Sequence, residues 1–282
     1  YLVEVSYQGY ASVLVTVTIK ENTYQVFTLQ ERFVENENVT VTGVASVTKA
    51  KQAVQPISIV KKSDLFKNAG TNIMDQLSKM VPGIAVLTSG PAIAKPVIRG
   101  LGYNRIVTVN DGIRQEGQQW GDEHGIEIDE YSIQRVEILK GPASLLYGSD
   151  AMAGVIHLIT NTPVEQGTIK GNVQQTYMSN NQLLGTNANI AGHAKNGFNW
   201  NAYASVKNAK DYSNAYGKVL NSRFSEKNMG GYLGVNKFWG YSHLLVSSFT
   251  QNIGMIEGER DAATGSFLLY PGTAEERIAT NE

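Results

Sequence analysis

The polar side chains that could do chemistry gather in one stretch of the sequence, residues 115–129, which reads QEGQQWGDEHGIEID. An imidazole, that of His124, directly follows two carboxylates, Asp122 and Glu123. Imidazole beside carboxylate suits zinc, copper or iron, whereas oxygen ligands alone suit larger cations. We therefore predict a metal contact at Asp122, Glu123 and His124. The alternative is that these acidic side chains form the solvated face of a loop.

The sequence offers no convincing arrangement for catalysis. None of the four histidines has the HExxH spacing of a zinc peptidase, and all are far apart: His124, His157, His193 and His243. The segment 100–102, Gly-Leu-Gly, lacks the third glycine of a dinucleotide-binding loop. We predict that the protein is not an enzyme, requires no cofactor and has no nucleotide site.

Composition excludes further classes of function. A net charge of −1 and 17% charged residues argue against a nucleic-acid partner, which would need a basic face. Cysteine is absent, so the chain has neither disulfides nor thiolate metal ligands. No apolar run approaches the ~18 residues of a spanning helix, a test that membrane strands escape because only alternate residues are apolar. Tyr1 is not an initiator methionine, and we expect that the start of the chain has been removed.

The elements that hold the polar loop are clearest just after it, in residues 133–160. Residues 135–140 alternate charged and apolar side chains, which predicts a short strand. Gly141-Pro142 predicts a turn and the start of a short helix over 143–147, which Gly148 ends. The small residues 151–154 follow, and 155–159 read as a buried strand.

This order of strand, Gly-Pro turn, short helix, glycine and strand closely resembles the end of the plug domain of TonB-dependent outer-membrane receptors. The sequence RVEILKGPASLLYG carries the resemblance, and the family's PGI, IRG and DG(I/V) motifs occur in order at 82–84, 98–100 and 111–113. The resemblance runs from about 56 to 160. It implies a mixed fold: an α+β plug inside a transmembrane antiparallel β-barrel.

Within the plug we expect strands at 57–60, 84–87, 96–99 and 105–110. Ser63 can cap one turn, and Thr71 can cap a helix whose Ile73, Met74, Leu77 and Met80 recur at helical spacing. In the family, a loop between plug strands meets incoming substrate. The resemblance therefore implies cargo contact, to a metal or a metal chelate, at Gln118, Trp120, Asp122, Glu123, His124 and Glu127. Alternatively, the carboxylates of this loop pair with arginines on the barrel wall.

After Thr160 the pattern becomes that of membrane strands. Residues 167–178 place Ile169, Val173 and Tyr177 on one face and polar residues on the other, and the segments 184–193 and 198–206 alternate in the same way. Apolar side chains opposite Asn, Gln and Ser over ~10 residues are typical of a lipid-facing strand with a polar lumen. We predict weaker strands at 231–239 and 241–251, and long polar loops at 208–228 and from 254 onward. A soluble sandwich is the alternative.

Five strands cannot close a plugged barrel of about 22, so we expect only its first part here.

The N-terminal residues form separate modules. Residues 1–36 are rich in β-branched and aromatic residues, which predicts a small antiparallel β-sandwich. They resemble the later part of the carboxypeptidase-regulatory-like module that precedes the plug in many Bacteroidetes receptors. Residues 37–55 form a linker. In the family this linker carries the TonB box, which pairs with the energising partner by β-addition, and the candidates are Val39, Thr40, Val41 and Thr42. A linker strand without a partner is the alternative.

The predicted domains are therefore 1–36, 37–55, a plug at 56–160 and the first strands of a barrel at 161–282. Arg99 and Arg135 lie at the ends of plug strands, and we predict that they seat the plug by pairing with wall carboxylates. Binding of an anionic siderophore is the alternative role.

The resemblance implies a TonB-dependent active importer in the outer membrane of a Gram-negative bacterium. The expected partners are a TonB-type energising protein, outer-membrane lipid, an extracellular small-molecule or metal cargo, and a surface lipoprotein. Siderophore, haem or other iron uptake, or uptake of a transition metal, is the first interpretation of the cargo. An oligosaccharide or peptide importer, with Trp120 and Tyr103 as stacking platforms, is the second. A non-transporting surface receptor or scaffold is the third.

Overall fold

The computed structural model describes residues 2–5, 13–17, 24, 26–28, 40–41, 48–49, 57–160, 162–215, 217–254 and 263–264. It divides into two compact units, Tyr1–Val54 and Gln55–Glu282. In the first unit, β1 (Leu2–Val5) pairs antiparallel with β2 (Val13–Thr16), and β3 (Thr40–Val41) pairs antiparallel with β4 (Thr48–Lys49). The predicted TonB box is thus described only at Thr40 and Val41, because Val39 and Thr42 lie outside the described residues. Most of the predicted loop from 254 onward also lies outside them.

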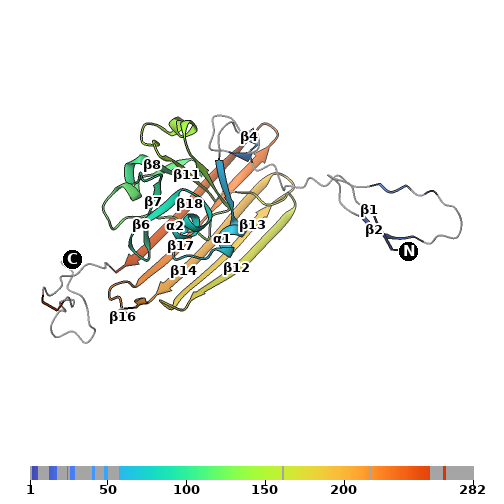
Figure 1. The fold of residues 1–282 in the computed structure, drawn as a ribbon. Helices are drawn as coiled ribbons and strands as arrows, with labels where there is room; N and C mark the ends of the chain where they lie inside the picture. Colours follow the sequence, from blue (N-terminus) through green and yellow to red (C-terminus); the bar gives the residue numbers. More distant parts are fainter. Residues whose placement is uncertain are drawn as a thin grey trace. The chain divides into compact units, whose positions relative to one another are not determined.

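Residues 57–160, called the plug below, are built on a five-stranded mixed sheet (Figure 1). Neighbouring strands are antiparallel except for β11 and β8, and the order is β5 (Ile57–Lys61), β10 (Arg135–Leu139), β11 (Gly154–Ile159), β8 (Ile106–Asn110) and β9 (Ile113–Gln115). A separate hairpin joins β6 (Ile84–Gly90) to β7 (Ile93–Ile98). The helices are α1 (Lys62–Lys67), α2 (Ile73–Met80) and the 3-10 turns η2 (Tyr103–Arg105), η3 (Gly117–Gln119) and η4 (Pro142–Tyr147).

The plug core lies between α2 and one face of this sheet. Ile73, Met74 and Leu77 recur on the buried side of α2, as their helical spacing predicts. They pack in one cluster with alternate residues of β10 and β11, namely Val136, Ile138, Ile156 and Leu158. The helix therefore holds the two strands that flank the Gly-Pro turn.

The helix caps differ from the prediction. Asn72, not Thr71, is the N-cap of α2, and its side chain accepts a hydrogen bond of 3.0 Å from the backbone N–H of Asp75. The Thr71 hydroxyl instead donates to the Asp75 carboxylate. Ser63 lies inside α1, whose N-cap is Lys61. The Thr71 prediction was wrong by one residue because either of two adjacent polar residues can cap a helix. The Ser63 prediction was wrong because α1 begins two residues earlier, without a side-chain cap.

The turn between β10 and β11 matches the prediction. Gly141 has φ +92° and Gly148 has φ +98°, values that glycine adopts without strain, and they flank the 3-10 turn η4. Gly154, the first residue of β11, has φ +154°, and a Cβ atom built there would lie 2.5 Å from the carbonyl oxygen of Leu139. A glycine is therefore required where the two strands meet.

Residues after 160 form a second five-stranded sheet, called the wall sheet below (Figure 1). Its neighbours are all antiparallel, in the order β12 (Thr168–Met178), β13 (Leu183–His193), β14 (Phe198–Ala209), β17 (Phe224–Lys237) and β18 (Gly240–Ile253). A small hairpin, β15 (Ser213–Asn214) with β16 (Gly217–Lys218), lies in the connection that joins β14 to β17 along the chain. Among the described residues, no helix is long and apolar enough to cross a membrane.

The wall sheet exposes its apolar face and buries its polar face. Val173 and Val246 on one face are 77% and 68% exposed, while Asn187 and Lys207 on the other are 1% and 2% exposed. A soluble sandwich would bury the apolar face instead. The alternation predicted from the sequence is confirmed, and the apolar face is the exposed one.

The predicted boundaries of the fourth wall strand, 231–239, were wrong, because β17 spans Phe224–Lys237. The predicted polar loop at 208–228 instead holds the end of β14, the hairpin β15–β16 and the first residues of β17, which begins at Phe224. Glu226 and Asn228 are buried on the inner face, at 3% and 4% exposure. A charged side chain at an inward position hides the apolar alternation on which the prediction depended.

Candidate functional site

The polar loop predicted at 115–129 lies across strand β7. The backbone N–H of Ile126 donates to the carbonyl oxygen of Ala94 (3.4 Å), and a Cβ atom at Gly125 would lie 3.0 Å from the Ala94 backbone. The buried Lys95 ammonium donates to the carbonyl oxygens of Trp120 (3.0 Å) and Gly121. The loop is thus fixed at its middle by backbone contacts.

The Lys95 Nζ also lies 4.6 Å from the centre of the Tyr103 ring. Burial lowers the pKa of Lys95, and the charges of Asp122 and Glu123 act in the opposite direction. The Tyr103 hydroxyl in turn donates to Asp122 (3.2 Å). Lys95 therefore ties the loop's backbone to the plug and lies in the field of the Asp122 and Glu123 carboxylates.

The predicted cargo contacts divide into buried and exposed groups. Gln118 is buried, accepts from the Thr108 hydroxyl (2.6 Å) and donates to the carbonyl oxygen of Ile106 (3.0 Å), which makes it a support of the loop. Trp120 is 65% exposed. Asp122, Glu123, His124 and Glu127 also reach solvent. The exposed members form a surface that a ligand can reach.

His124 lies between the carboxylates of Glu123 and Glu127, two of the predicted cargo contacts. Its Nδ1 lies 2.8 Å from Glu127 Oε1, and its Nε2 lies 3.8 Å from Glu123 Oε1. Asp122 is engaged by Tyr103 instead. Within the described residues, no group of three or more His, Asp and Glu side chains is arranged to hold a metal ion. The metal contact at Asp122, Glu123 and His124 stays a prediction.

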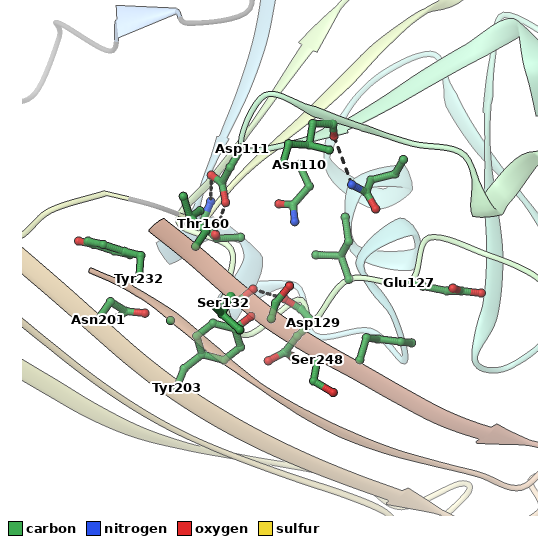
Figure 2. A pocket seen from close by; sticks show the side chains of 18 residues that line it. Asn110, Asp111, Glu127, Asp129, Ser132, Thr160, Asn201, Tyr203, Tyr232 and Ser248 are labelled. Carbon is green, nitrogen blue, oxygen red and sulfur yellow. Dashed lines mark hydrogen bonds between the residues drawn. The ribbon is translucent and has the colours of Figure 1, made fainter. Parts of the chain in front are cut away.

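The loop leads into a cavity of about 190 Å³ between the plug and the wall sheet (Figure 2). Glu127 and Asp111 line it from the plug, and Tyr203 and Ser248 line it from the wall. Asp111 accepts from the backbone N–H (2.9 Å) and the hydroxyl of Thr160, the last plug residue. Both polar and apolar side chains line the cavity, and Glu127 belongs to it as well as to the exposed loop.

A buried charge cluster joins the plug to the wall. The Lys207 ammonium on β14 lies 2.7 Å from Glu130 of the plug and 2.8 Å from Glu226 of β17. One residue earlier, Asp129 accepts from the Ser205 hydroxyl (2.9 Å). The sequence analysis missed these residues. The available signal was a lysine at an inward position of a strand predicted to face a lumen.

The two arginines predicted to seat the plug lie at the ends of plug strands, Arg135 at the start of β10 and Arg99 just after β7. Arg135 pairs with Glu137 on its own strand (2.9 Å). Arg99 is exposed just after β7, at φ +52°. The structure describes five strands of the wall, fewer than the predicted barrel has. Pairing of Arg99 and Arg135 with wall carboxylates therefore stays a prediction.

Residues 49–155 match the family model described as the TonB-dependent receptor plug domain. The chain carries a TonB-dependent receptor plug. This identification agrees with the packing of residues 57–160 against the polar face of a sheet that is apolar outside. Several of the relatives and solved structures that match this chain are receptors or transporters by name.

Two relatives illustrate the range of names. The iron-regulated outer membrane virulence protein of Vibrio cholerae is 35% identical over 158 residues, which cover 53% of this chain and 24% of that protein. A hemin receptor of Yersinia enterocolitica is 33% identical over 121 residues, covering 43% of this chain and 17% of the receptor. The chain thus spans about a quarter or less of the length of these relatives.

Solved structures share the fold. The copper transporter OprC aligns with a TM-score of 0.60 at 19% identity, covering 71% of this chain and 31% of OprC. The siderophore receptor PirA from Acinetobacter baumannii aligns with a TM-score of 0.56 at 22% identity, covering 72% and 32%. The predicted fold class, a plug followed by the first strands of a wall, is confirmed.

Proposed function

We propose that this chain is the plug and early wall of an outer-membrane importer whose cargo is an iron chelate, haem or a transition metal. The observation that carries the proposal is a family plug packed on the polar face of strands whose other face is apolar and exposed. Such strands match a membrane wall with a polar lumen. The protein is then located in the outer membrane of a Gram-negative bacterium, the location that the name of the Vibrio cholerae relative gives.

Energy for import has to come from a partner. The outer membrane has no ATP supply, and the plug closes the lumen, so work has to reach the plug mechanically from the periplasmic side. A TonB-type protein pairing with a linker strand would deliver it by β-addition. Thr40 and Val41, already extended in β3, are the described part of the candidate segment.

The cargo proposal rests on the exposed loop. His124 and its carboxylate neighbours offer hydrogen bonds and charge to a metal chelate, while Trp120 offers a flat apolar face. Relatives and structural neighbours are named for iron regulation, hemin, siderophores and copper. An intact chelate or haem fits this loop better than a bare ion, because His124 already pairs with Glu127 and Asp122 with Tyr103.

Binding to the full-length receptor tests the cargo. Ferric enterobactin, hemin and Cu²⁺ are titrated against the wild type and the double variant Asp122→Ala/His124→Ala. We expect one of the three to bind and the double variant to weaken that binding at least about tenfold, equal to ~1.4 kcal/mol. Glu165→Ala, an exposed carboxylate on the far side of the plug boundary, is the control. If the wild type and the double variant bind ferric enterobactin, hemin and Cu²⁺ with the same affinities, the metal-cargo proposal is removed.

A second candidate is an oligosaccharide importer of the same architecture. The exposure of both Trp120 and Tyr103 favours it, since aromatic faces stack on sugar rings. Saturable binding of a maltodextrin that Trp120→Ala abolishes, with no binding of the three metal species, would decide for it. Tight binding without energy-dependent uptake would instead indicate a non-transporting receptor.

A further inference from the structure

Lys207 joins four segments of the protein at one buried point. It faces inward from β14, opposite its register partner Glu226 on β17, so the wall itself supplies one cation and one anion. From the plug, Glu130 contacts the same ammonium, and Lys207 also donates to the carbonyl oxygen of Thr71 (3.3 Å) just before α2. The side chains of Lys207, Glu130 and Glu226 are 2%, 7% and 3% exposed.

The cluster holds more acidic than basic groups. Asp129 from the plug is buried beside Glu130 and bonded to Ser205 of the wall. The second ammonium is that of Lys62 on α1, which donates to the carbonyl oxygen of Tyr131 (3.1 Å) and lies within the field of Asp129. The remaining titratable groups that face the cluster are the phenols of Tyr131 and Tyr203.

Three carboxylates therefore share two ammonium groups. A buried surplus of one negative charge is costly, and a bound proton removes that cost. Burial, the largest cause, raises the pKa of Glu130 to about 7; Lys207 opposes the shift and Glu226 adds to it. Burial also raises the pKa of Asp129. The geometry and the charge count thus both indicate that the cluster needs one bound proton.

We propose that Lys207 anchors the plug to the wall through Glu130, and that the anchor is complete only when the cluster's carboxylates hold one proton. The plug then leaves the wall more readily as pH rises. This inference adds a positioning residue and a control by pH to the proposed import function. It concerns attachment in the absence of cargo, so its failure leaves the cargo proposal intact.

The direction follows from the two states of Glu130. In the seated plug its pKa is about 7, while in the released plug the solvated carboxyl has its ordinary value of 4.5. The seated state therefore binds the proton more tightly, and its advantage is complete below pH 4.5. Between pH 4.5 and about 7 the ratio of seated to released plug should fall up to about tenfold per pH unit, and then level off.

Hydrogen exchange on the full-length receptor, without cargo, tests the anchor from pH 5 to 8. Exchange rates are divided by the intrinsic rate at each pH, and the wall strands, residues 168–253, serve as the internal reference. In the wild type we expect protection of plug residues 57–160 to decrease with pH while that of the wall stays constant. Lys207→Met should lose plug protection at least a hundredfold at every pH, and Lys207→Arg should restore most of it.

Glu130→Gln separates this proposal from a simple ion pair, because glutamine mimics the protonated carboxyl. We expect plug protection within about threefold of the wild type at pH 5.5 and a flat profile up to pH 8. Glu165→Gln, an exposed carboxylate paired with Lys170, should keep the wild-type profile. A flat wild-type profile overturns the proton requirement. Loss of protection in Glu130→Gln at every pH shows an ionised partner and overturns it too. The anchor is overturned if Lys207→Met keeps the wild-type protection of the plug. If that variant does not fold, a loss of plug protection in Lys207→Arg overturns the anchor instead.

Discussion

Two clusters of similar composition, one in the polar loop and one between plug and wall, behave differently because one is exposed and the other is buried. In the loop, His124 and Glu127 lie 2.8 Å apart with side chains 46% and 43% exposed. In the anchor, Lys207 and Glu130 lie 2.7 Å apart with side chains 2% and 7% exposed. Exposed pairs contribute little to stability because water screens them. The loop pair is therefore free to exchange its partners for a ligand.

The buried pair has the opposite property. A charge removed from water has to keep its partner, and the loss of one member leaves the other without compensation. The anchor therefore fixes position, whereas the loop serves recognition. The following substitutions test this contrast, from the largest expected effect on plug attachment to the smallest.

Lys207→Met should have the largest effect, because it leaves the Glu130 and Glu226 carboxylates buried without their cation. We expect plug attachment to weaken by about 3–5 kcal/mol, measured by denaturant titration of a fluorescent label on the plug. Lys170→Met, which removes an exposed partner of Glu165, is the matched control and should change little. A change below ~1 kcal/mol for Lys207→Met would contradict the contrast.

Ser205→Ala should have an intermediate effect. The Ser205 hydroxyl donates to the buried Asp129 carboxylate (2.9 Å), and hydrogen bonds to charged groups are worth about 1.5–3 kcal/mol. The same label should report a loss in that range, and Ser205→Thr should retain most of the stability. If the two variants behave alike, the hydroxyl does not hold the plug.

Lys95→Met should loosen the loop and leave the plug attached. The change removes the donor to the carbonyl oxygens of Trp120 and Gly121. We expect exchange protection of residues 117–125 to fall at least about tenfold, equal to ~1.4 kcal/mol, with protection of β10 and β11 unchanged. Lys79→Met, which removes an exposed donor to the carbonyl oxygen of Ala69, serves as control. A loss of protection across the whole plug would show that Lys95 is a core residue and not a loop support.

His124→Ala should have the smallest effect on attachment. Its pair with Glu127 is exposed, so the plug should lose less than about 1 kcal/mol, while cargo affinity falls. Measuring both quantities on one preparation separates recognition from attachment. A plug that unfolds together with the loss of binding would make the loop part of the anchor.

Much of the fold could be predicted from local sequence. Gly141, Pro142 and Gly148 impose backbone angles, so the unit from β10 to β11 was predicted nearly residue by residue. The apolar faces of β12 to β14 repeat over long runs and were equally clear. The cap of α2 was misplaced because Thr71 and Asn72 are both good caps, and only the folded chain shows that Asn72 accepts from the backbone N–H of Asp75.

The site was harder to predict, because its chemistry depends on long-range contacts. The run of acidic residues after Trp120 drew attention to the loop, yet Gln118 within it is a buried support. Lys207 and Glu130 are far apart in sequence, and nothing local to either residue indicates that they meet. The burial that turns an ordinary ion pair into an anchor is a property of the packed plug and wall together.

A covalent link between plug and wall tests the central claim most directly. The chain has no cysteine, so Asp129→Cys with Ser205→Cys places the only two thiols of the described chain where the two native side chains meet at 2.9 Å. In the full-length receptor in outer membranes, we predict that a short bis-methanethiosulfonate joins these thiols and blocks uptake of labelled cargo until a reductant is added. Thiols that stay unlinked while the receptor imports normally would contradict a plug seated in this wall.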